Sequence, residues 1–218
     1  MRIGLLVPSS NTVMEPDFHR HLGQDCIVST TRIFLENVTR EAEVRMLEED
    51  LPRAIELLRT TSPNVVVFGC TSAGALGQDN EIADRIASGT RARAVTVLHA
   101  VQSALQNIAP RRLAVFTPYV EDLTNCIASS LAAAGMPPVK SAGMGIRENL
   151  AIGRVSPDEI VSFVKSQFDA SLDCIFLSCT NWQAIDAIEP LRSSFGIPIV
   201  TSNQAAIDAV RYLRTTVK

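Results

Sequence analysis

The sequence predicts an α/β protein made of two Rossmann-like half-domains with parallel sheets, related by a pseudo-twofold axis. Short apolar runs with almost no charge alternate with helical patterns along the 218 residues. Two of these runs, 64–68 and 173–177, are rich in β-branched and aromatic residues, as strands buried on both faces are. Each run then stops in a similar polar motif, Gly69-Cys70-Thr71-Ser72 or Ser178-Cys179-Thr180-Asn181.

An internal repeat is the observation that divides the chain into halves. Three landmarks recur in one order at nearly one spacing: Pro8 and Pro118 lie 110 positions apart, Cys70 and Cys179 lie 109 apart, and Val95 and Val200 lie 105 apart. We therefore expect half-domains at 1–97 and 98–218, with the last helix, 203–218, able to pack back on the first half. Halves of about 100 residues fit usual domain sizes.

The first half is expected to begin with a strand that Pro8 stops, because proline cannot continue the ladder. Thr39 or Asn37 caps a helix through Glu49, and Pro52 starts a further helix. Gly74 and Gly77 indicate a loop after the first cysteine motif, and Gly89 is the expected C-cap of the next helix. The expected strands are 2–7, 26–34, 65–68 and 94–98, and the expected helices are 14–22, 39–49, 52–58 and 81–87.

The second half is expected to repeat this plan. Gly135 closes one helix, and Ser156-Pro157-Asp158-Glu159 reads as a capping box with proline at the first helical position. The expected strands are 112–117, 139–144, 173–177 and 197–201, and the expected helices are 99–108, 121–134, 156–168, 188–195 and 203–213.

Composition narrows the class of function. The net charge is −3 with no Lys/Arg cluster, which argues against nucleic-acid binding. No apolar run reaches the ~20 residues of a membrane span, and the apolar start is too short for a signal peptide. Five cysteines without C-x-x-C spacing favour reduced thiols in a cytoplasmic protein, and the three histidines form no metal-ligand pattern. We expect neither a metal nor a cofactor, and a homo-oligomer stays open.

The two cysteine motifs are the expected reactive site, because ligands of open α/β sheets bind at the carboxyl ends of the strands. A thiolate is both a base and a nucleophile, and a helix N-terminus beside it is expected to lower its pKa. Two thiols on opposite faces of a substrate can serve as base and acid. Thr71, Ser72, Thr180 and Asn181, with their backbone N–H groups, are the expected donors to substrate carboxylates.

The motifs resemble the two-cysteine pattern of the aspartate/glutamate racemase superfamily. Four further segments resemble its maleate cis-trans isomerase and arylmalonate decarboxylase branch more closely: 7–12, 117–119, 148–154 and 201–205. The resemblance implies an active site between two Rossmann-like halves, no cofactor, and a small carboxylate substrate. It implies that the first cysteine adds to the alkene of maleate and that the second supplies a proton.

The resemblance also makes Asn11, Tyr119 and Asn149 substrate-binding candidates. The alternative role of Asn11 is that of a turn residue or helix cap. The alternative role of Tyr119 is to cover the end of the sheet, although its phenol can donate a hydrogen bond to a carboxylate. We expect Cys70 to attack as thiolate, since a loop of small residues follows it, and Cys179 to be the acid/base, since bulky Trp182 follows it.

Other readings remain open at this point. An amino-acid or hydantoin racemase, or an ectoine-utilisation relative, would use the same two thiols. Arylmalonate decarboxylases keep only the second cysteine, so the presence of Cys70 disfavours them. A carboxylate-binding sensor without catalysis would not need both cysteines. Cys26, Cys126 and Cys174 are expected to be core residues, since cysteine often packs as a small hydrophobe.

Overall fold

The computed structural model describes residues 1–216 and contains two four-stranded sheets, both wholly parallel. The first has the order β2-β1-β3-β4, from β1 (Arg2–Pro8), β2 (Ile27–Ile33), β3 (Val65–Phe68) and β4 (Arg93–Thr96). The second has the order β6-β5-β7-β8, from β5 (Leu113–Thr117), β6 (Lys140–Gly143), β7 (Cys174–Leu177) and β8 (Ile199–Thr201). Counted within each half the two orders are the same, which confirms the predicted fold class.

Helices connect successive strands, as parallel neighbours require. In the first half they are α1 (Met14–Leu22), α2 (Arg40–Arg45), the π-helical turn η1 (Met46–Asp50), α3 (Leu51–Arg59), α4 (Thr71–Ala73), the π-helical turn η2 (Gly74–Gln78) and α5 (Asp79–Thr90). The others are α6 (Val97–Ile108), α7 (Glu121–Ala133), α8 (Asn149–Arg154), α9 (Pro157–Gln167), α10 (Ala184–Phe195) and α11 (Ser202–Thr216).

The strands that precede the cysteines are the most buried of the fold. All residues of β3 and β7 are at most 1% exposed, because helices cover both faces of each sheet. β3 pairs with β1 and β4, and β7 pairs with β5 and β8. The residues after β1 and β3 therefore leave the same edge of one sheet, and those after β5 and β7 leave the same edge of the other.

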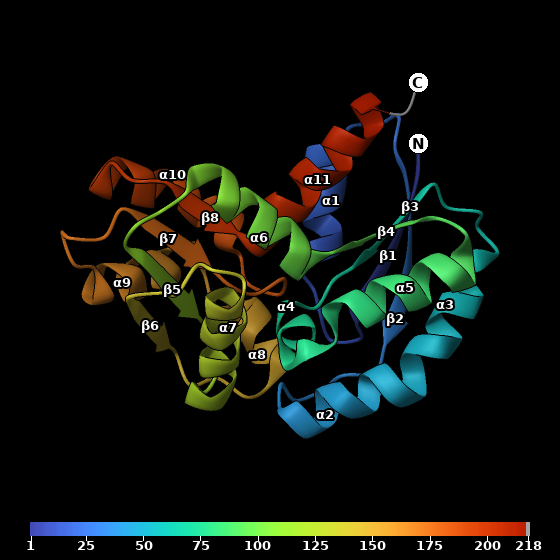
Figure 1. Ribbon diagram of the computed structural model, residues 1–218, viewed down its shortest axis with the longest axis horizontal. Helices are drawn as coiled ribbons and strands as arrows, with labels where there is room; N and C mark the ends of the chain where they lie inside the picture. Colours follow the sequence, from blue (N-terminus) through green and yellow to red (C-terminus); the bar gives the residue numbers. More distant parts are fainter. Residues whose placement is uncertain (217–218) are drawn as a thin grey trace.

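The two sheets lie on opposite sides of the molecule and are joined by crossing helices (Figure 1). α6 leaves β4 and also packs against β8, while α11 leaves β8 and packs against α1, α6 and β4. Residues 217–218 of the expected last helix lie outside the described residues. The division of the chain at residue 97 stays a prediction.

Helix continuity in the first half differs from the expectation. We expected two helices that meet at Pro52, but α2, η1 and α3 run on from residue 40 to residue 59. Pro52 has no backbone N–H to donate to the helix. It is tolerated because it lies in the first turn of α3, directly after a π-helical turn. The Thr39 cap is confirmed, since its side chain accepts a hydrogen bond from the N–H of Ala42.

The segment after Cys70 is also more regular than expected. It is helical in α4 and η2, where we expected a loop, with a kink at Gly77, whose φ is 96°. The expected C-cap at Gly89 is wrong, because α5 continues to Thr90 and Arg91 takes the left-handed cap position. Gly89 instead permits close packing, since a Cβ there would lie 2.4 Å from Cγ2 of Ile55 on α3.

In the second half, the capping box at Ser156 and Glu159 is confirmed. The short helix α8 was not predicted.

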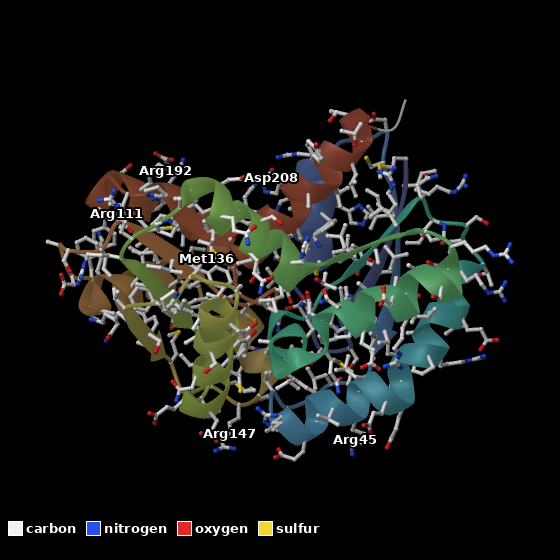
Figure 2. The ribbon with its side chains drawn as sticks, in the orientation of Figure 1. Arg45, Arg111, Met136, Arg147, Arg192 and Asp208 are labelled. Carbon is white, nitrogen blue, oxygen red and sulfur yellow. The ribbon has the colours of Figure 1, made fainter. Side chains whose placement is uncertain are left out.

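None of the helices among residues 1–216 combines the length and the apolar character that a membrane crossing requires. Figure 2 shows Arg45, beyond Glu43 on α2, and Arg147, before α8, reaching the same side of the molecule, where both line a surface hollow of about 500 Å³.

Candidate active site

Four segments that follow strands form the candidate site. Asn11 follows β1 and Cys70 follows β3 in the first half, while Tyr119 follows β5 and Cys179 follows β7 in the second. All four side chains are buried, with Cys70 5% and Cys179 4% exposed. The structure brings the two expected cysteines to the junction between the halves, so a small molecule held there would touch both motifs.

Hydrogen bonds across the junction fix the two cysteine motifs against each other. The hydroxyl of Thr180 donates to the carbonyl oxygen of Gly69 at 2.8 Å, which links the residues next to the two cysteines. The side-chain N–H of Asn11 donates to the same hydroxyl at 3.0 Å. These bonds are buried, and a buried polar group left unpaired is costly, so they hold the junction in one register.

Asn11 also holds the turn that leads into α1, whose N-cap position is Val13. Its Oδ1 accepts from the backbone N–H groups of Val13 and Met14, each at 3.0 Å. Asn11 therefore has the role of a turn residue that we considered beside substrate binding. Its amide nitrogen has two protons, and the bond to Thr180 uses one of them, which leaves one for a ligand.

Asn149 and Asn181 join α8 to both halves. The amide nitrogen of Asn181 donates to the carbonyl oxygen of Asn149 at 2.6 Å, and its Oδ1 accepts from the N–H of Thr12 at 2.8 Å. Asn149 donates in turn to the hydroxyl of Ser10 at 2.9 Å. Gly153 permits this packing, because a Cβ there would lie 2.5 Å from Oγ1 of Thr12 and 3.0 Å from Oδ1 of Asn181.

The hydroxyl groups after Cys70 are already engaged within the protein. Thr71 donates to the hydroxyl of Ser202 at 2.9 Å, and Ser72 donates to Oε1 of Glu43. Both residues begin α4, whose first N–H groups have no intrahelical partner. Carboxylate binding at this motif would therefore fall to backbone N–H groups more than to the hydroxyls that we expected.

Glu43 is the site residue that sequence reasoning missed. It lies on α2, is fully buried, and its Oε1 is 3.8 Å from the sulfur of Cys70. Burial raises its pKa from 4.5 to about 7, against the lowering effect of hydrogen bonds from Ser72 and Cys70 and of the Arg40 charge. A signal existed in the sequence, because Glu43 precedes the core residues Met46 and Leu47 by three and four positions and so shares their helix face.

Cys179 has different neighbours. Its sulfur accepts from the N–H of Asn181 at 3.2 Å, and the phenol of Tyr119 hydrogen-bonds to it. Both bonds lower the pKa of Cys179, but burial outweighs them and raises it to about 12. Burial likewise raises the pKa of Cys70 well above its ordinary value, and the Glu43 charge adds to this.

We expected a helix N-terminus to lower the pKa of the thiols, and this expectation is wrong, because the pKa of each thiol is raised overall. The N–H of Ala73 does favour the Cys70 thiolate, but the loss of water around a buried sulfur is the larger effect. Both thiols are protonated at neutral pH in this closed arrangement. A thiolate must then form by transfer of the proton to a neighbouring group or to the substrate.

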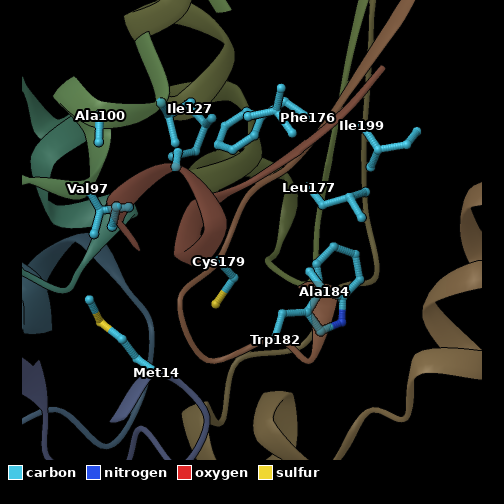
Figure 3. Close-up of a cluster of buried hydrophobic side chains, with 14 of the residues drawn as sticks. Met14, Val97, Ala100, Ile127, Phe176, Leu177, Cys179, Trp182, Ala184 and Ile199 are labelled. Carbon is cyan, nitrogen blue, oxygen red and sulfur yellow. The ribbon is translucent and has the colours of Figure 1, made fainter. Parts of the chain in front are cut away.

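The expected crowding of Cys179 by Trp182 is also wrong. The Trp182 ring is fully buried and lies beside Phe163, with the ring centroids 6.4 Å apart. Figure 3 shows the Cys179 sulfur directed away from Trp182, toward the side on which Met14 lies. The two cysteines differ through Glu43 and Tyr119 instead, and not through the bulk of the next residues.

The remaining cysteines lie outside this junction. Cys174 is fully buried at the start of β7, where burial raises its pKa to about 12. Cys26 and Cys126 are half-buried, and their sulfurs accept hydrogen bonds from Arg214 and Arg40, respectively. None of the three follows the carboxyl end of a central strand.

The sequence profile of the arylmalonate decarboxylase family matches residues 3–216. The chain belongs to this family. The match confirms the resemblance inferred from the motifs, including the branch that maleate isomerases share with arylmalonate decarboxylases.

Similar members of this family carry two kinds of name. A maleate isomerase of Geobacillus stearothermophilus is 25% identical, over 94% of this chain and 88% of its own. An arylmalonate decarboxylase of Bordetella bronchiseptica is 28% identical, over 96% of this chain and 89% of its own.

A solved structure shares the fold throughout. The maleate cis-trans isomerase of Nocardia farcinica, in a mutant with a covalently bound succinylcysteine intermediate, superimposes with a TM-score of 0.90. It is 22% identical and covers 96% of this chain and 90% of its own.

Proposed function

We propose that this protein is a cofactor-independent cis-trans isomerase that converts maleate to fumarate with Cys70 and Cys179. The observation that carries the proposal is the meeting of the two cysteine motifs at one buried junction, joined by the bond from Thr180 to the carbonyl of Gly69. A decarboxylase or a sensor has no need of a second thiol there. The maleate isomerases among its relatives support the same choice.

The proposed reaction starts with addition of the Cys70 sulfur to one alkene carbon of maleate. The thiol proton passes to a neighbouring base, to be returned when the C–S bond breaks, a C–S bond forms, and the π pair moves to the other carbon, beside its carboxylate. Cys179 then donates a proton to that carbon, which gives a succinyl group on Cys70. The former double bond is now single and rotates. Cys179 takes the proton back, the C–S bond breaks, and fumarate leaves.

The succinyl group connects this scheme with the relatives. A succinylcysteine intermediate is named for the Nocardia farcinica isomerase, whose fold this chain shares. In our proposal the same adduct forms on Cys70, since its neighbour Glu43 makes its surroundings unlike those of Cys179.

Substrate carboxylates would bind without ion pairs in this scheme. The proposed donors are the N–H groups at the start of α4 and after β7, with the side chains of Asn11, Tyr119 and Asn149. Neutral donors suit a dianion that must reorient, because they hold each carboxylate without fixing it as a bidentate arginine would. We assign the substrate-binding role to Thr71, Ser72, Thr180 and Asn181 mainly through their backbone groups.

Proton NMR in D₂O tests the proposal without added cofactor. Maleate, both enantiomers of aspartate and glutamate, a hydantoin and an aryl malonate are incubated with the protein in parallel. We expect maleate to give fumarate and the other compounds to stay unchanged. Deuterium at the α-carbon of an amino acid would replace the proposal by a racemase, and loss of CO₂ from the aryl malonate would replace it by a decarboxylase.

A further inference from the structure

Glu43 is paired with Cys70, but it takes no part in the bond-making steps of the proposed reaction. Glu43 is a carboxyl group buried to 0% exposure beside a buried thiol, and its Oε1 accepts from both that thiol and the Ser72 hydroxyl. Within residues 1–216, its Oε2 is buried and has no hydrogen-bond partner. A buried carboxyl without an ion pair is costly to keep, so its position calls for a chemical reason.

The proposed addition needs a group that takes the Cys70 proton. The thiol is protonated at neutral pH, because burial raises its pKa well above the ordinary value. Water has little access to the thiol of a residue that is 5% exposed. Glu43 is the carboxyl group whose oxygen lies within hydrogen-bond reach of that sulfur, at 3.8 Å.

The other groups that face Glu43 leave this proton path open. Arg40, on its own helix, favours the carboxylate, and Ser72 from α4 donates to it. Tyr119 and Cys179 from the other half are neutral at pH 7, because burial raises the pKa of each. The pKa of Glu43 itself is about 7, close to neutral pH, where a general base is most effective.

We infer that Glu43 is the proton acceptor for Cys70, so that the pair delivers the thiolate only as the C–S bond forms. The inference rests on the proposed function for the identity of the attacked alkene. As the sulfur adds to maleate, the S–H bond breaks and its proton passes to the Glu43 carboxylate. When the C–S bond breaks again, the same proton returns from Glu43 to Cys70.

Ser72 has a positioning role in this scheme. Its hydroxyl donates to Glu43 and lies 3.6 Å from the Cys70 sulfur, so it holds the carboxyl oxygen toward the thiol. An Asp at position 43 would keep the base but withdraw it by one methylene. A Gln would keep the size and the hydrogen-bond acceptor but could take no proton.

The first test compares turnover in wild type, Glu43→Gln and Glu43→Asp over pH 5–9. Glu48→Gln, an exposed residue on η1, is the matched control. We expect kcat to fall by about 10²-fold or more in Glu43→Gln with little change in KM, and to recover partly in Glu43→Asp. The acidic limb near pH 7 should vanish in Glu43→Gln. A Gln variant that folds and keeps both kcat and that limb would overturn the inference.

The second test needs no turnover, so it separates this inference from the proposed function. The alkylation rate of Cys70 by iodoacetamide is followed against pH by peptide mass spectrometry. Removal of the Glu43 charge should shift the profile to lower pH, so that Glu43→Gln has more thiolate but less activity. If the Cys70 profile of Glu43→Gln coincides with wild type, the two groups are not coupled and the inference fails, whatever the substrate.

Discussion

Glu43 and Tyr119 make chemically unlike sites out of two cysteines that the repeat places at equivalent positions. Cys70 faces a carboxyl group that can take a proton, whereas Cys179 lies beside a phenol and a backbone N–H, which are hydrogen-bond donors. At the residue scale, the division of roles between nucleophile and acid/base follows from these partners.

Glu43 should also make stability depend on pH. Burial raises its folded-state pKa from 4.5 to about 7, so the folded state binds more protons than the unfolded state between these values. The free energy of unfolding therefore falls as pH rises through this window, by at most about 3 kcal/mol from this group.

Urea unfolding at several pH values measures this effect. Glu43→Gln lacks the titrating group, so its stability relative to wild type should increase from pH 4.5 to pH 8. Glu48→Gln, which removes an exposed carboxyl, should change little. Parallel curves for wild type and Glu43→Gln would mean that Glu43 titrates in the folded protein as it does in water.

Gly153 should matter for activity although it has no side chain. A methyl group there would meet Thr12 and Asn181, and Asn181 orients the N–H that contacts Cys179. We expect Gly153→Ala to lower kcat/KM by at least tenfold and to lower the melting temperature. Arg154→Ala, an exposed neighbour on α8, is the control and should keep both. Unchanged kinetics in Gly153→Ala would show that α8 does not set the geometry of Asn181.

At the element scale, α2 and α8 supply what the strand ends do not. The strand ends place both cysteines, Asn11 and Tyr119, while α2 adds Glu43 and α8 adds Asn149. An isolated bridge between Asn37 and Glu148 ties the segments before these helices together. The helices are short, and they depend on tertiary contacts more than on their own propensity.

Helix α9 permits a test that separates folding from catalysis. Its capping box pairs the Ser156 hydroxyl with the N–H of Glu159, at the surface of the second half. We expect Ser156→Ala to cost about 1 kcal/mol of unfolding free energy in urea titration, with kcat and KM unchanged. Ser166→Ala, exposed in the last turn of the same helix, should cost less. Equal losses in the two variants would remove the capping explanation.

The strand ends and the helix that contains α2 were predictable from the sequence, whereas α8 and the role of Glu43 were not. Each cysteine motif follows a short apolar run, Val65–Phe68 or Cys174–Leu177, a local pattern that survives in any α/β context. The helix face of Glu43 indicates its burial, but its contact with Cys70, 27 positions away, arises because α2 packs against α4, and no local pattern encodes that contact. α8 has six residues including Gly153, too few for a periodic signal. The pKa expectation failed because burial depends on the whole junction.

The whole molecule is closed over its site. Both cysteines are at most 5% exposed, so a substrate reaches them only when the halves or their connecting segments open. Such opening is typical of enzymes that exclude water from a reactive intermediate. Arg45 and Arg147 line a surface hollow beside α2 and the segment before α8 (Figure 2).

A site that is closed over Cys70 and Cys179 predicts that the cysteines of this protein react with an alkylating reagent at different rates. Iodoacetamide at pH 8 should modify the half-buried Cys26 at least tenfold faster than Cys70. Succinate, a saturated dicarboxylate that cannot accept a thiol, should slow Cys70 further and leave Cys26 unaffected. Peptide mass spectrometry gives both rates in one sample. Equal rates, or no effect of succinate on Cys70, would contradict a closed dicarboxylate site.

The most direct test of the two-cysteine account is the location of a covalent adduct. Cys179→Ser is incubated with maleate, quenched in acid and mapped by intact-mass and peptide mass spectrometry, beside wild type, Cys70→Ser and the control Cys126→Ser. Either change at the pair should reduce fumarate formation by several orders of magnitude, because serine is a far weaker nucleophile and acid. Our account predicts that Cys179→Ser carries the mass of one maleic acid on Cys70. An adduct found only on Cys179, or full turnover in Cys70→Ser, would contradict it.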